Sequence, residues 1–181
     1  MEVVSVNIAE PRTLVVSGRE VATGIFKRPV QGRVAVGPLG LEGDVQADRS
    51  VHGGEAKAVY AYAVEDVEWW ESELARELGP GFFGENLTLH GVDVSGARPG
   101  DRWTIGDLEL AVTEPRLPCQ KLAAKVGDPK FVKRFARAGR PGAYLRVLAE
   151  GSVGAGDFLE GTARVAAFTP TVAELAPGRA A

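Results

Sequence analysis

The chain has 181 residues, of which 45% are hydrophobic and 25% are charged, and these ordinary values set aside disordered, collagen-like and membrane proteins. A chain of this length is expected to form one domain with a sizeable core. The formal net charge of -3 at pH 7 gives the surface as a whole no electrostatic reason to bind nucleic acid or an anionic membrane, so we expect neither partner.

The N-terminal residues carry no basic segment followed by an apolar one, and no stretch of about 20 apolar residues occurs anywhere in the chain. We therefore expect an unprocessed, cytoplasmic protein. The residues from Val3 onward instead begin the first of a series of predicted strands.

Short runs rich in β-branched residues recur between clusters of Gly, Pro and Asp, a pattern typical of a strand-rich fold. They predict strands at Val3–Ile8, Leu14–Val16, Val34–Val36, Val59–Ala63, Asn86–Leu89, Trp103–Ile105, Leu108–Thr113, Tyr144–Leu148 and Thr162–Phe168. Many short strands favour a closed or nearly closed barrel, because closure removes unpaired strand edges.

Two longer segments have the spacing of amphipathic helices. In Val64–Leu78, apolar residues recur at helical spacing with glutamates between them. In Pro129–Ala138, the preceding Asp128 is a candidate N-cap and Gly139 ends the pattern, and a short helical turn is predicted at Lys121–Val126. We therefore predict a mainly β, barrel-like domain with a few peripheral α-helices at residues 1–165, followed by a C-terminal tail at residues 166–181.

Cys119 is the only cysteine of the chain, which excludes an internal disulfide, a zinc ribbon and an iron–sulfur cluster. It lies between a predicted strand and a predicted helical turn, with two prolines and the cations Arg116 and Lys121 nearby. Positive charge favours the thiolate, which is the form of cysteine that binds metals. The alternative is a small buried hydrophobic residue. The prolines and cations favour the chemical role, because a structural cysteine needs neither.

The segment Gly43–Lys57 concentrates glycines, acids, bases and one of the two histidines. Glycines let backbone N–H groups approach an anion closely, so Arg49, His52 and Lys57 are candidates to complete a pocket for a phosphate or another oxyanion. The alternative is a solvated loop in which Asp44 and Asp48 cap turns. A zinc site formed by these aspartates and the histidine would require a helix, which the glycines disfavour.

Two further loops carry polar residues suited to such a pocket. Asn86 precedes a predicted strand, and its amide both donates and accepts hydrogen bonds, as recognition of a polar heterocycle requires; alternatively it closes a turn. Lys27 and Arg28 are adjacent cations in a loop, where they either join the anion pocket or are simply solvated.

Taken together, these segments closely resemble the MOSC family, named for the C-terminal domain of molybdenum cofactor sulfurases, and within it the stand-alone YiiM-type proteins. The matching motifs occur in the family's order and span roughly residues 19 to 160. They are Thr23–Val30, Leu39–Asp44, His52–Tyr60, Gly84–Leu87, Pro115–Leu122 and Gly142–Val147. Each motif is weak alone, but their common order makes the resemblance specific.

The resemblance implies a β-barrel-like domain that binds the pyranopterin form of the molybdenum cofactor, with the Cys119 thiolate as the ligand to molybdenum. Soft sulfur ligands suit this metal, and the phosphate of the cofactor needs cations and backbone donors. By motif position, the cofactor-binding residues are His52, Asn86 and Arg116, with Lys27, Arg28 and Arg49 as further candidates.

The resemblance also implies an oxidoreductase. Its expected substrates are N-hydroxylated small molecules such as hydroxylaminopurines and amidoximes, and its electrons come from a separate redox protein. The first alternative is a carrier of molybdenum cofactor, or of sulfur as a Cys119 persulfide. The second alternative is a barrel that has lost the cofactor.

Overall fold

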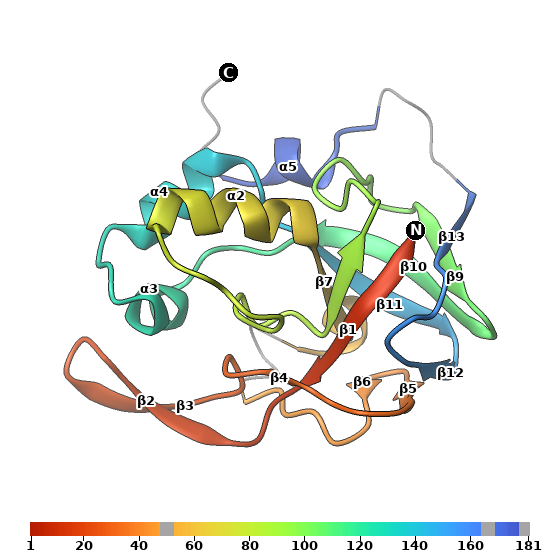
Figure 1. Cartoon of the computed structure of the whole chain (residues 1–181), viewed down its shortest axis with the longest axis horizontal. Helices are drawn as coiled ribbons and strands as arrows, with labels where there is room; N and C mark the ends of the chain where they lie inside the picture. Colours follow the sequence, from red (N-terminus) through yellow and green to blue (C-terminus); the bar gives the residue numbers. More distant parts are fainter. Residues whose placement is uncertain (48–52, 164–168, 178–181) are drawn as a thin grey trace.

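The computed structural model describes residues 1–47, 53–163 and 169–177. Its main feature is a sheet that curls into a half-barrel, with the strand order β13-β9-β10-β11-β7-β8-β1-β4 (Figure 1). The strands are β1 (Glu2–Ile8), β4 (Arg28–Pro29), β7 (Val59–Ala63), β8 (Leu87–His90), β9 (Arg102–Ile105), β10 (Leu108–Pro115), β11 (Ala143–Ala149) and β13 (Glu160–Ala163). The prediction of a mainly β, barrel-like fold is confirmed.

Strand β7 lies inside this sheet, between β11 and β8, and every one of its residues is buried. Its small residues face an aliphatic core within the half-barrel, whereas Tyr60 and Tyr62 face a second, aromatic core. This is the alternation expected of a strand that is covered on both faces. Helix α2 (Val64–Leu74) follows directly and carries the chain across to β8, so that β7 and β8 can pair in parallel.

The aromatic core fills the space between β7 and the helices α2, α3 (Gln120–Val126) and α4 (Phe131–Ala138). Trp70 of α2 stacks on Phe135 of α4, with ring centroids 5.7 Å apart and planes inclined by 7°. Trp70 Nε1 donates a hydrogen bond to the Tyr62 hydroxyl at 3.0 Å, which satisfies the polar atom of the buried indole. This packing fixes α3 and α4 side by side at one end of the molecule (Figure 1).

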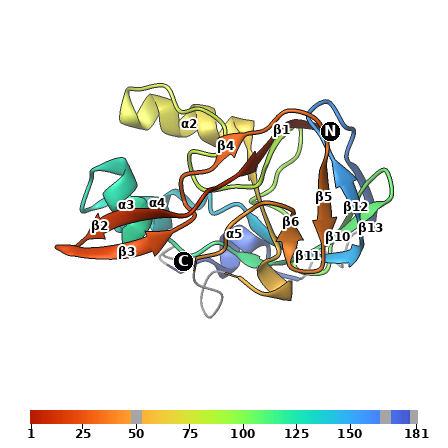
Figure 2. The same cartoon turned by 90° about the horizontal axis from the view of Figure 1, so that it is seen from below.

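Two smaller sheets flank the half-barrel. The hairpin of β2 (Arg12–Val16) and β3 (Arg19–Thr23) turns at Ser17 and Gly18, whose φ angles are 51° and 77°. Positive φ at both turn positions suits the twist of a two-residue hairpin. The hairpin packs against α3 (Figure 2). The other sheet contains β5 (Val34–Gly37), β6 (Gly40–Leu41) and β12 (Gly151–Val153), and the short 3-10 helix η1 (Glu55–Lys57) precedes β7.

The two predicted amphipathic helices exist but are shorter than predicted. Helix α2 ends at Leu74 because Ala75 adopts the left-handed backbone conformation, with a φ of 48°. Helix α4 begins at Phe131 because the Asp128 carboxylate accepts a hydrogen bond from the Lys130 N–H at 2.8 Å and so forms a turn before the helix. The predicted helical turn after Cys119 is confirmed as α3. No helix in the described part of the chain is long and apolar enough to cross a membrane.

The described part of the predicted C-terminal tail packs on the half-barrel. Its helix α5 (Val172–Leu175) is capped by Thr171 and donates backbone hydrogen bonds to the Ala97 and Ser95 carbonyls at 2.8 and 2.9 Å. Val172 belongs to the aliphatic core. The last predicted strand, Thr162–Phe168, overlaps β13 at its first two residues, and residues 164–168 lie outside the described residues. The predicted domain boundary after residue 165 therefore stays a prediction.

Candidate functional site

Cys119 lies in a pocket formed where several loops meet the aromatic core. The pocket is open to solvent, and its cavity volume is about 90 Å³. Its walls come from the segment after β3, the segment after β6, the loop before β8, the loop between β10 and α3, and tyrosines of β7 and β11. Four of the residues predicted for the cofactor site line it, namely Lys27, Asn86, Arg116 and Cys119.

Cys119 occupies the position immediately before α3. Its carbonyl accepts hydrogen bonds from the N–H groups of Leu122 at 3.0 Å and Ala123 at 3.2 Å, which starts the helix. The extended backbone at this residue leaves the side chain half-buried on the pocket wall as a free thiol. Cys119 also packs against the aromatic core, so its role as a metal ligand stays a prediction beside the alternative of a small packed hydrophobic residue.

Arg116 is the buried cation of the pocket. Its side chain lies over the rings of Tyr60 and Phe135, at 5.7 and 5.4 Å from their centroids. Burial acts to lower the pKa of Arg116, but the neighbouring Tyr60 and Cys119 act to raise it and the net direction is upward, so the guanidinium stays charged. Its Nη1 atom is buried and has no hydrogen-bond partner in the described structure. A buried donor of this kind is costly unless a ligand satisfies it, and an anion would do so.

A buried carboxylate, Asp44, holds one wall of the pocket together. Lys27 Nζ lies 2.6 and 2.5 Å from its two carboxylate oxygens, and both side chains are at most 8% exposed. Burial lowers the pKa of Lys27, and Asp44 opposes that shift. The same carboxylate accepts from the Ala9 N–H and from Asn86 Nδ2, each at 2.8 Å. Sequence analysis considered Asp44 as a turn cap or as a ligand of a disfavoured zinc site, and missed this network because the partners come from three other segments.

The Asn86 amide is also used within the protein. Its Oδ1 accepts from the Tyr60 N–H at 3.1 Å, and its Nδ2 donates to the Asn7 carbonyl at 3.2 Å as well as to Asp44. Asn86 is 4% exposed and lines the pocket. In this arrangement it joins β1, β7 and the Asp44 segment, so its clearest role is to fix the pocket wall.

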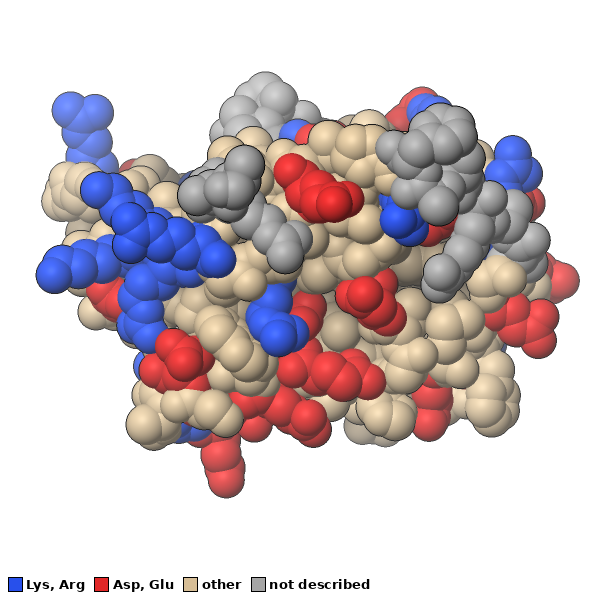
Figure 3. Space-filling view, turned by 90° about the horizontal axis from the view of Figure 1, so that it is seen from above, with Lys and Arg blue, Asp and Glu red and all other residues tan. Residues whose placement is uncertain are grey.

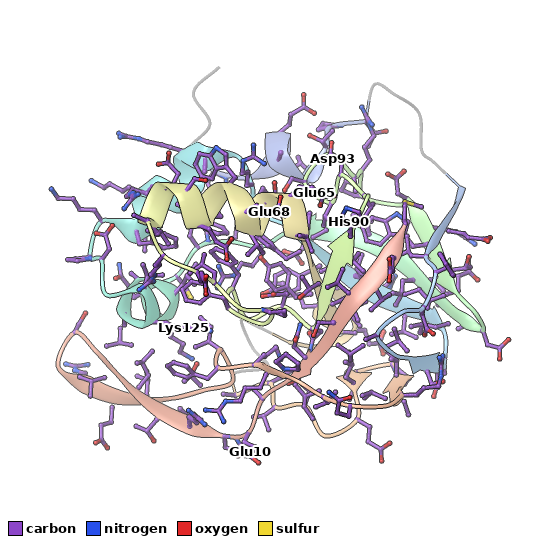
Figure 4. All side chains as sticks on the ribbon, viewed as in Figure 1. Glu10, Glu65, Glu68, His90, Asp93 and Lys125 are labelled. Carbon is purple, nitrogen blue, oxygen red and sulfur yellow. The ribbon has the colours of Figure 1, made fainter. Side chains whose placement is uncertain are left out.

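Helix α3 is tied to the opposite wall by Lys125. Its Nζ donates to the carbonyls of Ile25 at 2.9 Å and Phe82 at 2.5 Å, and it lies over the Phe26 and Phe82 rings (Figure 4). Burial lowers the pKa of Lys125 to about 8. Lys121 adds a hydrogen bond to the Ala22 carbonyl at 3.0 Å. These contacts hold the start of α3, and therefore Cys119, against the loops across the pocket.

The remaining predicted site residues are not part of this pocket as described. Arg28 is exposed on β4 and lines a separate depression with Phe26 and Glu10. Arg49 and His52 lie outside the described residues, as does Asp48, so the predicted roles of Arg49 and His52 stay predictions. Within residues 1–47, 53–163 and 169–177, no three His, Cys, Asp or Glu side chains gather as a metal site.

Sequence analysis also missed the aromatic wall of the pocket. Tyr60 and Tyr144 have ring centroids 5.2 Å apart, and Phe83, whose ring contacts Tyr62, also lines the pocket. The Tyr60 hydroxyl donates to the Pro141 carbonyl at 2.9 Å, so this ring presents a face rather than a free polar group. Alternation along the predicted strands could have placed the tyrosines on one face, but not beside a ligand.

The chain is similar to known proteins over most of its length. The model of the MOSC domain matches residues 48–160, more than half of the chain. YflK of Bacillus subtilis is 41% identical over 158 residues, which cover 87% of this chain and 72% of that protein. A Gibberella moniliformis protein named reductase is 35% identical over 144 residues, which cover 77% of this chain but 26% of that protein.

The crystal structure of YiiM from Geobacillus stearothermophilus has the same fold. It matches with a TM-score of 0.77 and 35% sequence identity, and the match covers 96% of this chain and 80% of that one. The family model and this structure therefore agree with the predicted family and with the half-barrel fold. The chain belongs to the MOSC domain family, which is associated with binding of the molybdenum cofactor.

Proposed function

We propose that this protein binds molybdenum cofactor in the Cys119 pocket and reduces N-hydroxylated small molecules, with electrons from a separate redox protein. The observation that carries the proposal is the pairing of a free, half-buried thiol with a buried guanidinium whose Nη1 has no partner in the described structure. The proposal places the reaction in the cytoplasm and involves neither nucleic acid nor a membrane.

The residues present fit an anionic, sulfur-rich group. The Cys119 thiolate would bind the soft metal, and Nη1 of Arg116 would donate a hydrogen bond to an anionic part of the cofactor. Lys27 is less available for this role, because Asp44 already neutralises it at 2.5 Å. When bound, the cofactor supplies two-electron oxygen-atom transfer, while the protein positions it and shapes the opening.

The chain's own residues would orient the substrate. Reduction of an N-hydroxyl compound to the amine consumes two electrons and two protons and releases one water. The rings of Tyr60, Phe83 and Tyr144 give an apolar wall against which a flat heteroaromatic substrate can pack. The Asp44 network and Lys125 keep the walls at fixed positions relative to Cys119.

The reductase name of the Gibberella relative supports a redox role for this kind of domain, although the match covers 26% of that protein. The carrier alternative has one structural argument in its favour, because Cys119 is a free and partly accessible thiol that could hold a persulfide. The two functions differ in turnover: a carrier holds its cargo without reducing an N-hydroxyl compound.

The test is to produce the protein in a host that makes molybdenum cofactor and to measure molybdenum per chain in wild type, Cys119→Ala and Arg116→Met. We expect about one molybdenum per wild-type chain, none in Cys119→Ala and a reduced amount in Arg116→Met. Loaded wild-type protein should then reduce benzamidoxime with reduced methyl viologen. Persulfide on Cys119 in mass spectra, together with no turnover, would favour the carrier function instead.

A further inference from the structure

Helix α4 and the residue before it present exposed cations on one side. Lys130, Lys133 and Arg137 recur at three- and four-residue spacing, which places them on one side of a helix. All three are exposed and form no ion pair within 4 Å among the described residues, although the charge of Lys130 helps to lower the pKa of Asp128. Arg134, on the same side, is instead paired with Asp128 at 3.0 Å and with Glu73 at 3.8 Å. We call Lys130, Lys133 and Arg137 the α4 basic face.

This face stands out against the charge of the whole molecule, which is -3 at pH 7. Figure 3 shows Lys and Arg side chains gathered most densely at one end of the molecule, the end at which α4 lies. Like charges three and four residues apart on a helix repel each other and destabilise it modestly. A positive face on a negatively charged protein also orients an acidic partner as it approaches and raises the association rate.

The opposite side of α4 leads directly to the pocket. Phe131 and Phe135 are fully buried in the aromatic core. The Phe135 ring lies 5.4 Å from the Arg116 guanidinium, and Arg116 lines the pocket together with Cys119. A helix with its side chains is about 10–12 Å across. The basic face is therefore separated from the pocket by one helix and its inner layer of rings.

Resting on the proposed function, we infer that the α4 basic face is the docking surface for an acidic electron-transfer protein. Conversion of each N-hydroxyl group to N–H and water requires two electrons and two protons. Two reduced carrier molecules, each oxidised by one electron, supply the electrons, and the protons come from solvent. The substrate occupies the pocket, so the donor needs a face of its own. Docking on α4 brings it close to the metal site without blocking the pocket.

The experiment uses molybdenum-loaded protein and an acidic [2Fe–2S] ferredoxin kept reduced by its reductase. The variant is Lys133→Glu/Arg137→Glu. The matched control, Arg19→Glu/Arg146→Glu, reverses two exposed cations on β3 and β11. Benzamidoxime reduction is measured with ferredoxin over a range of salt concentrations and, separately, with reduced methyl viologen. Circular dichroism and molybdenum content establish that each variant is folded and loaded.

We expect the α4 variant to lose at least about tenfold in the second-order rate with ferredoxin and most of the salt dependence, since steering contributes 10- to 1000-fold. Its rate with methyl viologen should equal that of wild type, and the control should match wild type with both donors. Three results with ferredoxin would overturn the docking inference and leave the proposed function standing. They are an unchanged rate in the α4 variant, an equal loss of rate in the control, and no turnover in wild type. Absence of turnover with methyl viologen in wild type would overturn the proposed function.

Discussion

Removal of the Asp44 carboxylate should be among the most damaging single changes to this fold. In Asp44→Ala, the Lys27 ammonium, which is 8% exposed in the native protein, would lose its ion-pair partner, and the Ala9 N–H and Asn86 Nδ2 would lose an acceptor. Breaking a buried ion pair on one side costs about 3–5 kcal/mol. Because a domain of this kind is stable by only about 5–15 kcal/mol, the variant would lose a large part of its free energy of unfolding.

A double-mutant cycle tests the physical reason. Lys27→Met leaves Asp44 with its two remaining N–H donors, so it should cost less than Asp44→Ala. The double variant removes both charges and should be more stable than Asp44→Ala alone, with a coupling of about 2 kcal/mol. Urea unfolding at pH 7, followed by tryptophan fluorescence, gives all four free energies of unfolding. A cost below about 1 kcal/mol for Asp44→Ala, or additive single effects, would refute the reasoning.

Three further predictions follow from the packing around the pocket. Burial lowers the pKa of Lys125 to about 8, so the unfolded chain holds this proton more tightly than the folded one; the penalty is full below pH 8 and fades as pH rises. Between pH 8 and 9.5, the free energy of unfolding of wild type should therefore rise by about 2 kcal/mol relative to that of Lys125→Met, as measured by urea unfolding. Parallel plots of the two free energies against pH would contradict this. Trp70→Ala should cost about 3–5 kcal/mol, measured by calorimetry, because it opens a cavity beside Phe135. Gly142→Ala should lower Tm, because Gly142 has a φ of 65° and a Cβ there would meet the Ala61 carbonyl oxygen at 2.6 Å; a variant with unchanged Tm would argue against strain.

Much of the fold was predictable because strand and helix signals are local. The alternation in β7 and the β-branched runs of β1 and β10 reflect side chains that must be buried on defined faces. Helix ends were less predictable: Ala75 ends α2 with a left-handed conformation that its residue type does not announce. The short strands β4 and β6 depend on pairing with β1 and β5, which no local pattern reports.

Sequence analysis could place together those residues of the candidate site that lie in one segment, as in the loop that carries Arg116 and Cys119. The site was less predictable where partners converge from distant segments. Asp44 acts through contacts with residues up to 42 positions away, and none of them leaves a signal near Asp44 itself. Adjacent cations also separate: Lys27 turns to Asp44 and Arg28 to the surface, since successive side chains in extended backbone point in opposite directions.

The position of β7 between the two cores has a consequence for motion. Its amides are covered on both faces and paired on both edges, so they should exchange with solvent hydrogen only when the whole domain opens. Most other parts of the pocket wall belong to loops or to the ends of elements, which open locally at lower free energy. Tyr60 thus anchors one wall to the slowest-exchanging strand. The loops around the pocket can therefore open locally while the wall formed by β7 stays in place.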